Sequence, residues 1–326
     1  MKVSVFDIHR FERPYLESAL GNHELRFHET RLSPATAELA RGADALVVFV
    51  NDQVSEEVLQ ALAAQGLRFV ATRSAGFNHI DLQAAKRFGL RVANVPDYSP
   101  HAVAEHTVAL MLALNRKLIR SHHRIQEQNF SLDGLVGFDM AGKTVGVVGL
   151  GRIGRVLAKI LDGFGCRVLG YDLKPPAEAG AWEFCADLET VFRASDILSL
   201  HVPLTPQTRY LIRRETIAWM KPGVMLVNTS RGALVKTKDV IKALKSGHIG
   251  YLGIDVYEEE EGLFFEDHSE DVLRDDVIAR LMTFPNVLIT SHQAFLTREA
   301  LTRIAETTAK NLECFEQGLE CPNALA

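Results

Sequence analysis

The stretch Lys143-Thr-Val-Gly-Val-Val-Gly-Leu-Gly-Arg-Ile-Gly-Arg155 decides the fold that we expect for this chain. Residues 144–148 are mostly apolar and β-branched, which predicts a buried parallel strand. Gly149, Gly151 and Gly154 follow in the spacing G-x-G-x-x-G, and an apolar stripe with a helical period comes next. This order of strand, glycines and helix is typical of the first turn of a dinucleotide-binding βαβ unit.

Each glycine has a physical role in such a unit. Gly149 makes the tight turn, Gly151 lets the backbone approach a pyrophosphate, and Gly154 lets the helix pack close to the strand. A second strand over 167–171 ends at Asp172, which follows Gly154 by 18 positions (172 − 154). An acid at this distance hydrogen-bonds the ribose 2′-OH, and it repels a 2′-phosphate. The pattern predicts NAD rather than NADP, with a glycine-rich turn of some other α/β protein as the alternative.

Composition is that of an ordinary globular protein. The 326 residues suffice for two domains, and 47% of them are hydrophobic and 24% charged. The net charge of −5 argues against a nucleic-acid partner, which would require a basic face.

Cysteines and apolar runs indicate the compartment. The four cysteines, at positions 166, 185, 314 and 321, form no C-x-x-C pair and have no histidine at metal-ligand spacing. We therefore expect reduced thiols and no bound metal. No targeting segment is recognisable at the start, and the longest apolar run, 108–114, is too short to span a bilayer. We expect a cytoplasmic protein that does not bind membranes.

Strands alternate with helices along most of the chain, which predicts parallel sheets with right-handed crossovers. In the first hundred residues we expect strands over 3–8, 24–28, 45–50, 67–72 and 92–95, and helices over 14–20, 34–40, 55–64 and 80–88. After a break at 96–100 we expect one long helix over 102–126. Beyond the glycine stretch, strands are expected over 167–171, 196–200, 224–228, 250–255 and 287–290, and helices over 187–193, 238–246 and 297–316.

Polar side chains follow three of the later strands, at the edge where open α/β sheets bind ligands. They are Arg231, the acidic run at 258–261 and His292. Hydride transfer to or from NAD requires an alcohol or carbonyl substrate, and the protein must then supply a proton. A histidine suits that role because its pKa lies near neutrality, and a neighbouring carboxylate raises that pKa. An arginine grips a substrate carboxylate through two parallel hydrogen bonds.

Each of these residues has a structural alternative. Arg231 could be a surface residue, three of the four acids are expected to be solvated, and His292 could be a satisfied core histidine. His201 is expected to be structural, in the loop over the cofactor. Four further histidines are expected at the surface or in the core without a catalytic role: His106, His122, His123 and His268.

In combination, these motifs resemble those of the D-isomer-specific 2-hydroxyacid dehydrogenases, and the D-lactate dehydrogenase branch most closely. The resemblance covers nearly the whole chain. It rests on Gly149-Leu-Gly-Arg-Ile-Gly154, His201-Val-Pro-Leu-Thr205, Val227-Asn-Thr-Ser-Arg-Gly232, Gly253-Ile-Asp-Val-Tyr257 and Ser291-His-Gln-Ala-Phe295. The segments Leu263-Phe-Phe-Glu-Asp-His-Ser269 and Cys321-Pro-Asn323 also look like the D-lactate branch.

The resemblance implies roles for single residues. The family's catalytic arginine and histidine fall on Arg231 and His292, and its glutamate falls on Glu260, five positions after the aspartate of the Asp-Val-Tyr motif. Four residues are expected to contact the substrate, the first two through backbone N–H groups: Ala75, Gly76, Tyr98 and Phe295. The expected cofactor contacts are Gly149, Gly151, Arg152, Ile153, Gly154, Asp172, Val202, Pro203, Thr208, Thr229, Ser230 and Asp255.

The same resemblance implies a two-domain α/β fold, in which a Rossmann-type NAD domain (99–295) is inserted into a flavodoxin-like α/β substrate domain (1–98 and 296–326). It implies an NAD-dependent D-lactate dehydrogenase that reduces pyruvate, a fermentation enzyme, expected as a homodimer or homotetramer. Two alternatives stay open. One is a relative acting on a larger 2-oxo acid such as phenylpyruvate or a branched-chain acid. The other is a regulatory protein of the same fold that senses NADH.

Overall fold

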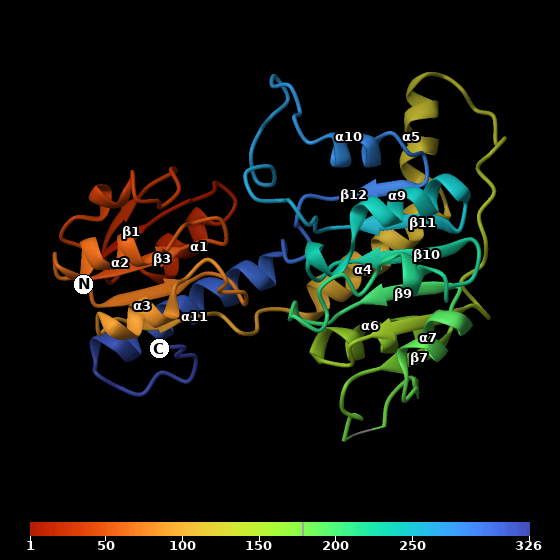
Figure 1. The fold of residues 1–326 in the computed structure, drawn as a ribbon. Helices are drawn as coiled ribbons and strands as arrows, with labels where there is room; N and C mark the ends of the chain where they lie inside the picture. The colour runs from red at the N-terminus through yellow and green to blue at the C-terminus, as the bar shows by residue number, and fades with distance from the viewer. Residues whose placement is uncertain (178) are drawn as a thin grey trace. The chain divides into compact units, whose positions relative to one another are not determined.

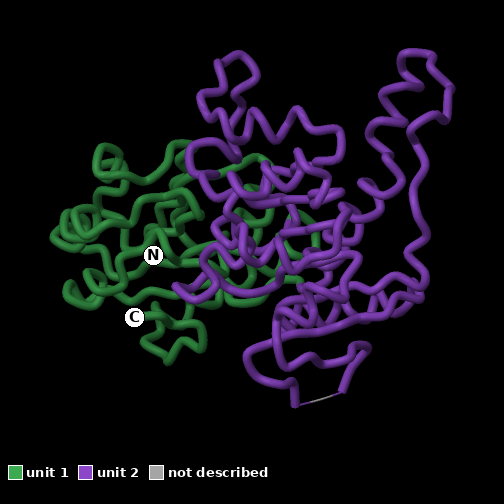
Figure 2. Tube along the Cα trace, turned by 45° about the vertical axis from the view of Figure 1, so that its right-hand side comes forward, with its two compact units in different colours: residues 1–99, 296–326 green, residues 100–295 purple. Residues whose placement is uncertain are grey.

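The computed structural model describes residues 1–177 and 179–326. The chain divides into two compact units, coloured separately in Figure 2: unit 1 consists of residues 1–99 and 296–326, and unit 2 of residues 100–295. Unit 2 is therefore inserted into the sequence of unit 1. The first boundary lies one residue after the expected one.

Unit 1, in which every residue is described, contains a five-stranded parallel sheet. Its strands are β1 (Lys2–Val5), β2 (Glu24–Phe27), β3 (Ala45–Val48), β4 (Phe69–Thr72) and β5 (Arg91–Ala93), in the spatial order β2-β1-β3-β4-β5. This is the strand order of flavodoxin-like folds. Strands β3 and β4 are buried along their whole length, as expected for a parallel sheet covered on both faces.

Helices cover both faces of this sheet. They are α1 (Arg13–Ala19), the 3-10 helix η1 (Ala37–Ala40), α2 (Glu56–Ala63), α3 (Leu82–Arg87) and α11 (Arg298–Glu316). Helices α2 and α3 bury Leu59 and Ala84 in one core cluster, whereas α1 and α11 bury Leu16 and Leu312 in the other. In Figure 1 the blue helix α11 accordingly lies with the red and orange elements of the chain's beginning.

The described part of unit 2 contains a seven-stranded parallel sheet. Its strands are β6 (Thr144–Val148), β7 (Arg167–Tyr171), β8 (Glu183–Phe184), β9 (Ile197–Leu200), β10 (Val224–Asn228), β11 (Ile249–Ile254) and β12 (Val287–Ile289), in the order β12-β11-β10-β9-β6-β7-β8. From β6 the strands follow one another outward to β7 and β8, and from β9 they follow one another outward in the other direction. Ligands of open α/β sheets bind at the carboxyl ends of the strands at such a topological switch point. The predicted α/β fold, a Rossmann-type domain within a flavodoxin-like one, is confirmed.

Unit 2 contains the helices α4 (Pro100–Asn115), α5 (Leu118–Gln126), α6 (Arg152–Gly163), α7 (Leu188–Ala194), α8 (Arg214–Ile217), η2 (Gly232–Leu234), α9 (Thr237–Ser246) and α10 (Asp276–Met282). Four of them form the two main layers on the sheet. Helices α4 and α6 share one core cluster through Met111 and Leu157, and α7 and α9 share the other through Phe192 and Val240. The short elements β8, α8, η2 and α10 were not expected from the sequence.

Several predicted boundaries are confirmed. Strands β6, β7 and β10 begin and end at the predicted residues. Ser55 accepts a hydrogen bond from Val58 N at the start of α2, and Thr297 accepts one from Ala300 N at the start of α11. These caps satisfy N–H groups that have no partner within the helix.

The single helix expected over residues 102–126 is wrong. Lys117 has a φ of +51°, and this left-handed residue separates α4 from α5. The side chain of Asn115 accepts from Phe138 N at 2.8 Å and donates to Phe138 O at 2.7 Å. A Cβ on Gly137 would lie 2.7 Å from Asn115 O, so the returning chain packs directly on the end of α4. Helix α5 and the loop after it project from the body of unit 2 (Figure 1).

Candidate active site

Three glycines with different surroundings shape the turn between β6 and α6. Gly149 has a φ of +103°, and a Cβ there would lie 2.3 Å from His201 O, just after β9. A Cβ on Gly154 would lie 1.9 Å from Gly149 O, so only glycine lets α6 approach the turn. At Gly151, by contrast, no described heavy atom outside the adjoining backbone lies within 4 Å of the Cβ position. The turn is therefore open at Gly151, beside a helix N-terminus suited to a phosphate group.

Asp172, just after β7, points into the same turn. Its Oδ2 accepts a hydrogen bond from Leu150 N at 2.8 Å, and Leu150 O accepts one from Arg155 Nε at 2.8 Å. The carboxylate lies at the carboxyl end of the strand next to β6. Asp172 thus stiffens the glycine turn, in addition to the ribose contact predicted for it.

Two of the predicted cofactor residues begin α6, and two join neighbouring strand ends. Arg152 is exposed and Ile153 half-buried in the first turn of the helix. Ser230 Oγ donates to Val202 O at 2.8 Å, which ties the loop after β10 to the loop after β9. Both loops lie at the carboxyl edge of the sheet.

The hydroxyls of two predicted cofactor residues are engaged within the protein. Thr208 Oγ1 accepts from Thr205 N at 2.8 Å and donates to Pro203 O at 2.7 Å. Thr229 is buried, and its Oγ1 lies 2.8 Å from Thr107 Oγ1 on α4. Both side chains hold the loops in place, which was not foreseen from the sequence.

Arg231 lies in the loop after β10. Its Nη1 donates to Ser230 O at 2.7 Å, and its own C=O accepts from Asn228 Nδ2 at 2.8 Å. A guanidinium has several N–H donors, so this bond leaves the fork able to grip a carboxylate through two others. A Cβ on Gly232 would lie 2.0 Å from Tyr257 C and O, which shows how closely the loops after β10 and β11 approach each other.

Glu260 and His292 form a hydrogen-bonded pair. Glu260 Oε1 lies 2.9 Å from His292 Nδ1, and Glu260 Oε2 accepts from Tyr257 N at 2.8 Å. One carboxylate oxygen fixes the acid to its own loop, and the other orients the imidazole. The opposite ring nitrogen, Nε2, is directed away from Glu260.

The remaining acids of the 258–261 run have other surroundings. Glu258 Oε1 accepts from Thr237 N at 3.1 Å, at the start of α9. Glu259 and Glu261 are exposed. Of the four acids, Glu260 is the one that the structure brings together with His292.

Asp255 organises the turn that carries His292. It is fully buried, and its backbone O accepts from His292 N at 2.7 Å. Its Oδ1 and Oδ2 accept from Gln293 N and Ala294 N, both at 2.9 Å. His292 itself has a φ of +48°, a conformation that non-glycine residues adopt at a cost. Three successive N–H groups bonded to Asp255 therefore hold a strained turn.

The surroundings of His201 do not suit a proton donor near pH 7. Burial lowers the pKa of His201 to about 4, so its imidazole is neutral near pH 7. Its Nε2 lies 2.8 Å from Ser199 Oγ on the same strand end. These contacts agree with the structural role predicted for it.

Ala75 and Gly76, expected to bind the substrate, lie in unit 1 just after β4. Ser74 Oγ donates to Gly76 O at 2.6 Å, and Asn94 Nδ2 donates to Ala75 O at 2.9 Å. The protein therefore engages the carbonyl groups of this loop and fixes its conformation.

An aromatic residue that the sequence analysis did not single out lies against the imidazole. The ring centroids of Phe265 and His292 are 5.8 Å apart, with the rings inclined by 35°. Phe265 has a φ of +68°, unusual for a bulky residue. The only signal for it was the resemblance of its segment, because 263–269 carries no periodic pattern. Of the two expected pocket residues, Phe295 is buried in unit 2, and Tyr98 is half-buried in unit 1.

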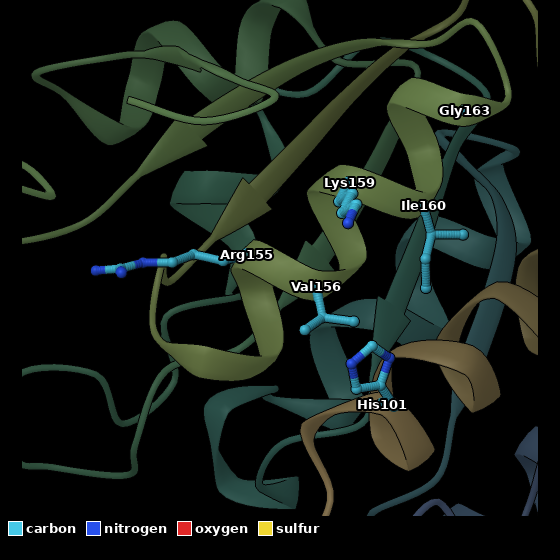
Figure 3. Close-up of a pocket in the computed structure, with 6 residues that line it drawn as sticks. All are labelled: His101, Arg155, Val156, Lys159, Ile160 and Gly163. Carbon is cyan, nitrogen blue, oxygen red and sulfur yellow. The ribbon is translucent and has the colours of Figure 1, made fainter. Parts of the chain in front are cut away.

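A pocket of about 550 Å³ lies elsewhere on unit 2. It is lined by His101 at the start of α4 and by Arg155, Val156, Lys159, Ile160 and Gly163 of α6 (Figure 3). Figure 3 shows the Arg155 side chain extending away from the other labelled side chains. None of the predicted catalytic, substrate or cofactor residues lines this pocket.

Among residues 1–177 and 179–326, no group of three or more His, Cys, Asp and Glu side chains is arranged to hold a metal ion. No helix in the same range combines the length and apolar character needed to cross a membrane. All four cysteines are free thiols.

Comparison with known proteins gives the family. The protein-family model described as "D-isomer specific 2-hydroxyacid dehydrogenase, NAD binding domain" matches residues 108–294. The chain is 50% identical to 2-hydroxyacid dehydrogenase A of Aspergillus oryzae, over 100% of this chain and 95% of that one. It is 49% identical to the D-lactate dehydrogenase of Escherichia coli, over 100% of both chains. The apo structure of D-lactate dehydrogenase from Escherichia coli matches with a TM-score of 0.91 at 46% identity, again over 100% of both chains.

The chain belongs to the D-isomer-specific 2-hydroxyacid dehydrogenases, as its motifs predicted. It is thus an NAD-dependent oxidoreductase, and its cofactor is NAD. The open position at Gly151 and the carboxylate of Asp172 fit this cofactor.

Proposed function

We propose that this protein is an NAD-dependent D-lactate dehydrogenase, which reduces pyruvate to D-lactate reversibly. The observation that carries the proposal is the Glu260–His292 pair, with its 2.9 Å hydrogen bond, on the same sheet edge as the glycine turn. The likeness to the Escherichia coli D-lactate dehydrogenase supports lactate as the product.

In this proposal Arg231 binds the substrate. Its guanidinium grips the carboxylate of pyruvate through two parallel hydrogen bonds, and the backbone N–H groups of Ala75 and Gly76 add to the grip. Tyr98 and Phe295 bound the space for the methyl group. The carbonyl carbon is thereby held in a fixed orientation, which lowers the entropic part of the barrier.

His292 supplies the proton. When bound, NADH would supply the hydride that C2 of pyruvate accepts. His292 gives its Nε2 proton to the carbonyl oxygen as negative charge develops there, and Glu260 stabilises the imidazolium before the transfer. The Nδ1 bond to Glu260 also fixes the plane of the ring. In lactate oxidation, His292 takes the proton back.

The cofactor residues divide by position. Gly149, Gly151 and Gly154, with Arg152 and Ile153, would hold the pyrophosphate at the start of α6, and Asp172 the adenosine ribose. The loops after β9 and β10 would contact the rest of the dinucleotide with Val202, Pro203, Thr208, Thr229 and Ser230. Asp255 would lie near the nicotinamide. In this scheme unit 2 is the NAD domain and unit 1 the substrate domain.

The test is a steady-state screen of NADH oxidation with pyruvate, phenylpyruvate and a branched-chain 2-oxo acid, with the configuration of the product determined. We expect the highest kcat/KM with pyruvate and a D product. A higher value with phenylpyruvate would favour the relative for larger acids. NADH binding without turnover of any 2-oxo acid would favour the NADH sensor.

We also propose a homodimer or homotetramer. Helix α5 and the loop after it carry large apolar side chains that are half or more exposed: Leu118, Ile119, Ile125, Phe130, Leu132 and Val136. A second copy of the chain would remove this surface from water. Light scattering should give a dimer or larger for the wild type and a smaller mass for a Phe130→Ser, Leu132→Ser variant. A monomeric wild type would contradict the proposal.

A cytoplasmic location and a role in fermentation complete the proposal. The role in fermentation is supported by the chemistry, because pyruvate reduction regenerates NAD from NADH. Deletion of the gene should abolish D-lactate release by oxygen-limited cells, and undiminished release would contradict this role.

A further inference from the structure

We propose that His106 is a positioning residue: through Thr290 and Asp255 it holds the turn that presents His292 to the substrate. This inference rests on the proposed function, because it takes His292 as the proton donor. His106 lies on α4, far from the proposed catalytic residues in sequence, and its sequence context predicts no catalytic role.

Counting donors fixes the direction of the hydrogen bonds around Thr290. The Thr290 hydroxyl has a single hydrogen, which it donates to Asp255 Oδ1 over 2.5 Å. His106 Nε2 lies 3.0 Å from the same hydroxyl oxygen. Since that hydrogen is already used, Thr290 accepts in the second bond and His106 Nε2 donates. The relay therefore runs from His106 to Thr290 to Asp255, with His106 Nε2 also 3.4 Å from Asp255 Oδ1.

Asp255 passes this constraint to the catalytic turn. Its backbone and carboxylate oxygens accept from the N–H groups of His292, Gln293 and Ala294. Thr290 N in addition donates to Ile254 O at 2.9 Å. His292 is held in the left-handed region, so the bonds around it must resist relaxation of the turn. The position of Asp255 thus sets the position of the imidazole.

Helix α4 is a firm support for this relay. It packs against β10, β11 and β12, and His106 has a side chain that is only 18% exposed. The next residue, Thr107, is buried and bonds Thr229 in the loop that leads to Arg231. Consecutive residues of one helix therefore hold the loop of the proposed proton donor and the loop of the proposed carboxylate grip.

Loss of the donor at His106 should act on turnover rather than on binding. Without it the Thr290 hydroxyl can rotate, and the turn around Asp255 loses one fixed end. The imidazole then spends less time in line with the substrate carbonyl, and a misplacement of about 1 Å can cost roughly 100-fold in rate. The glycine turn, Asp172 and Arg231, which in the proposal hold most of the dinucleotide and the pyruvate carboxylate, are unchanged. The affinities for NADH and pyruvate should therefore change little, even though Asp255 lies near the nicotinamide in the same proposal.

The test uses four variants of the full chain. His106→Leu removes the donor, and His106→Gln restores an N–H donor at nearly the reach of Nε2. Thr290→Val removes the hydroxyl with little change of shape. His101→Leu is the matched control, because this histidine lies on the same helix with its side chain 71% exposed. For each we would measure kcat and KM for pyruvate, the Kd of NADH and the melting temperature.

We expect His106→Leu and Thr290→Val each to lower kcat by roughly 10- to 100-fold, with KM and the Kd of NADH within about threefold of the wild type. His106→Gln should recover most of the loss, and the double variant His106→Leu, Thr290→Val should be no slower than either single one. His101→Leu should match the wild type.

A kcat of His106→Leu within twofold of the wild type would overturn the inference and leave the proposed function standing. So would multiplicative losses in the double variant, or a His106→Gln no faster than His106→Leu. If His106→Leu failed to fold, Thr290→Val would carry the test alone. A wild type that turned over no 2-oxo acid would remove the proposed function and this inference together.

Discussion

Two hydrogen bonds distinguish Glu260 from the other acids of its run. Its carboxylate accepts from Tyr257 N and faces Nδ1 of His292. Glu259, the exposed neighbour, brings the same charge to the same loop. Substituting each of the two glutamates in turn therefore separates the effect of the bond to His292 from the effect of the negative charge of the segment.

Glu260→Gln should shift to lower pH the limit above which pyruvate reduction falls, because the imidazolium loses the carboxylate that stabilises its charge. The pH dependence of kcat/KM measures this limit. Glu259→Gln should leave the profile in place. An unmoved profile for Glu260→Gln would mean that another group sets the limit.

Asp172 combines a charge with a structural hydrogen bond, and one substitution separates them. Asp172→Asn keeps an oxygen that can accept from Leu150 N but removes the charge that repels a 2′-phosphate. The ratio of kcat/KM with NADH to that with NADPH should fall by roughly tenfold. If Asp172→Ala relaxed the preference and Asp172→Asn did not, the shape of the turn would set selectivity.

The residues that sequence patterns missed have partners on distant segments. Glu260 could be named from its place in a motif, but its bond to His292 joins two loops. His106 and Phe265 carry no motif, and their roles depend on a helix and a loop that meet the turn after β12 only in the folded chain. The hydroxyl of Thr229, expected at the cofactor, bonds Thr107 on α4 for the same reason. That of Thr208 is engaged within its own loop.

At the scale of elements, the carboxyl ends of the strands in unit 1 hold buried titratable groups. Asp52, after β3, accepts from Phe49 N and Leu32 N, both at 2.6 Å. Burial raises the pKa of Asp52 from 3.8 to about 7. Burial lowers the pKa of His79, after β4, from 6.5 to about 4. The two shifts therefore make the stability of the folded chain depend on pH in opposite directions.

Their effects on stability have opposite signs. Between pH 3.8 and about 7 the folded chain holds a proton on Asp52 that the unfolded chain has released, so this contribution is lost as pH rises. Between pH 4 and 6.5 the unfolded chain protonates His79 and the folded chain does not, so this contribution is lost as pH falls. In the wild type the two largely offset each other.

Replacing one group should therefore expose the other. As the pH rises from 5 to 7, the free energy of unfolding of His79→Gln should change in a less favourable direction than that of the wild type. That of Asp52→Asn should change in a more favourable direction. The midpoint of urea unfolding at the two pH values measures this. Equal pH dependence in all three proteins would contradict the assignment of these pKa shifts.

Element prediction succeeded where local patterns are strong and failed where tertiary contacts decide. Buried strands such as β6 and β10 were predicted to the residue, because their apolar runs and flanking turns are local. The break at Lys117 was missed because apolar side chains continue in the sequence beyond α4. The break itself depends on a contact of Asn115 with Phe138, which is not visible in the local pattern. Helices as short as α8 have too few residues for a period to show.

At the scale of the whole molecule, three adjacent parallel strands place the catalytic candidates on one edge. Arg231, Glu260 and His292 follow β10, β11 and β12, which pair in that order. The rule that ligands bind at the carboxyl ends of strands allowed this edge to be predicted without knowing the strand order. The support of His292 by Glu260 was also expected, whereas the second bond of Glu260, from Tyr257 N, required the structure.

The most direct measurement of the central claim is kcat/KM for pyruvate reduction by Arg231→Lys. A lysine keeps the charge but cannot form the two-pronged grip, so we predict a loss on the order of 2–4 kcal/mol of transition-state stabilisation, roughly 30- to 1,000-fold. Arg214→Lys, on the exposed face of α8, should match the wild type. Near wild-type kcat/KM in Arg231→Lys would remove Arg231 from the site and contradict the proposed mechanism.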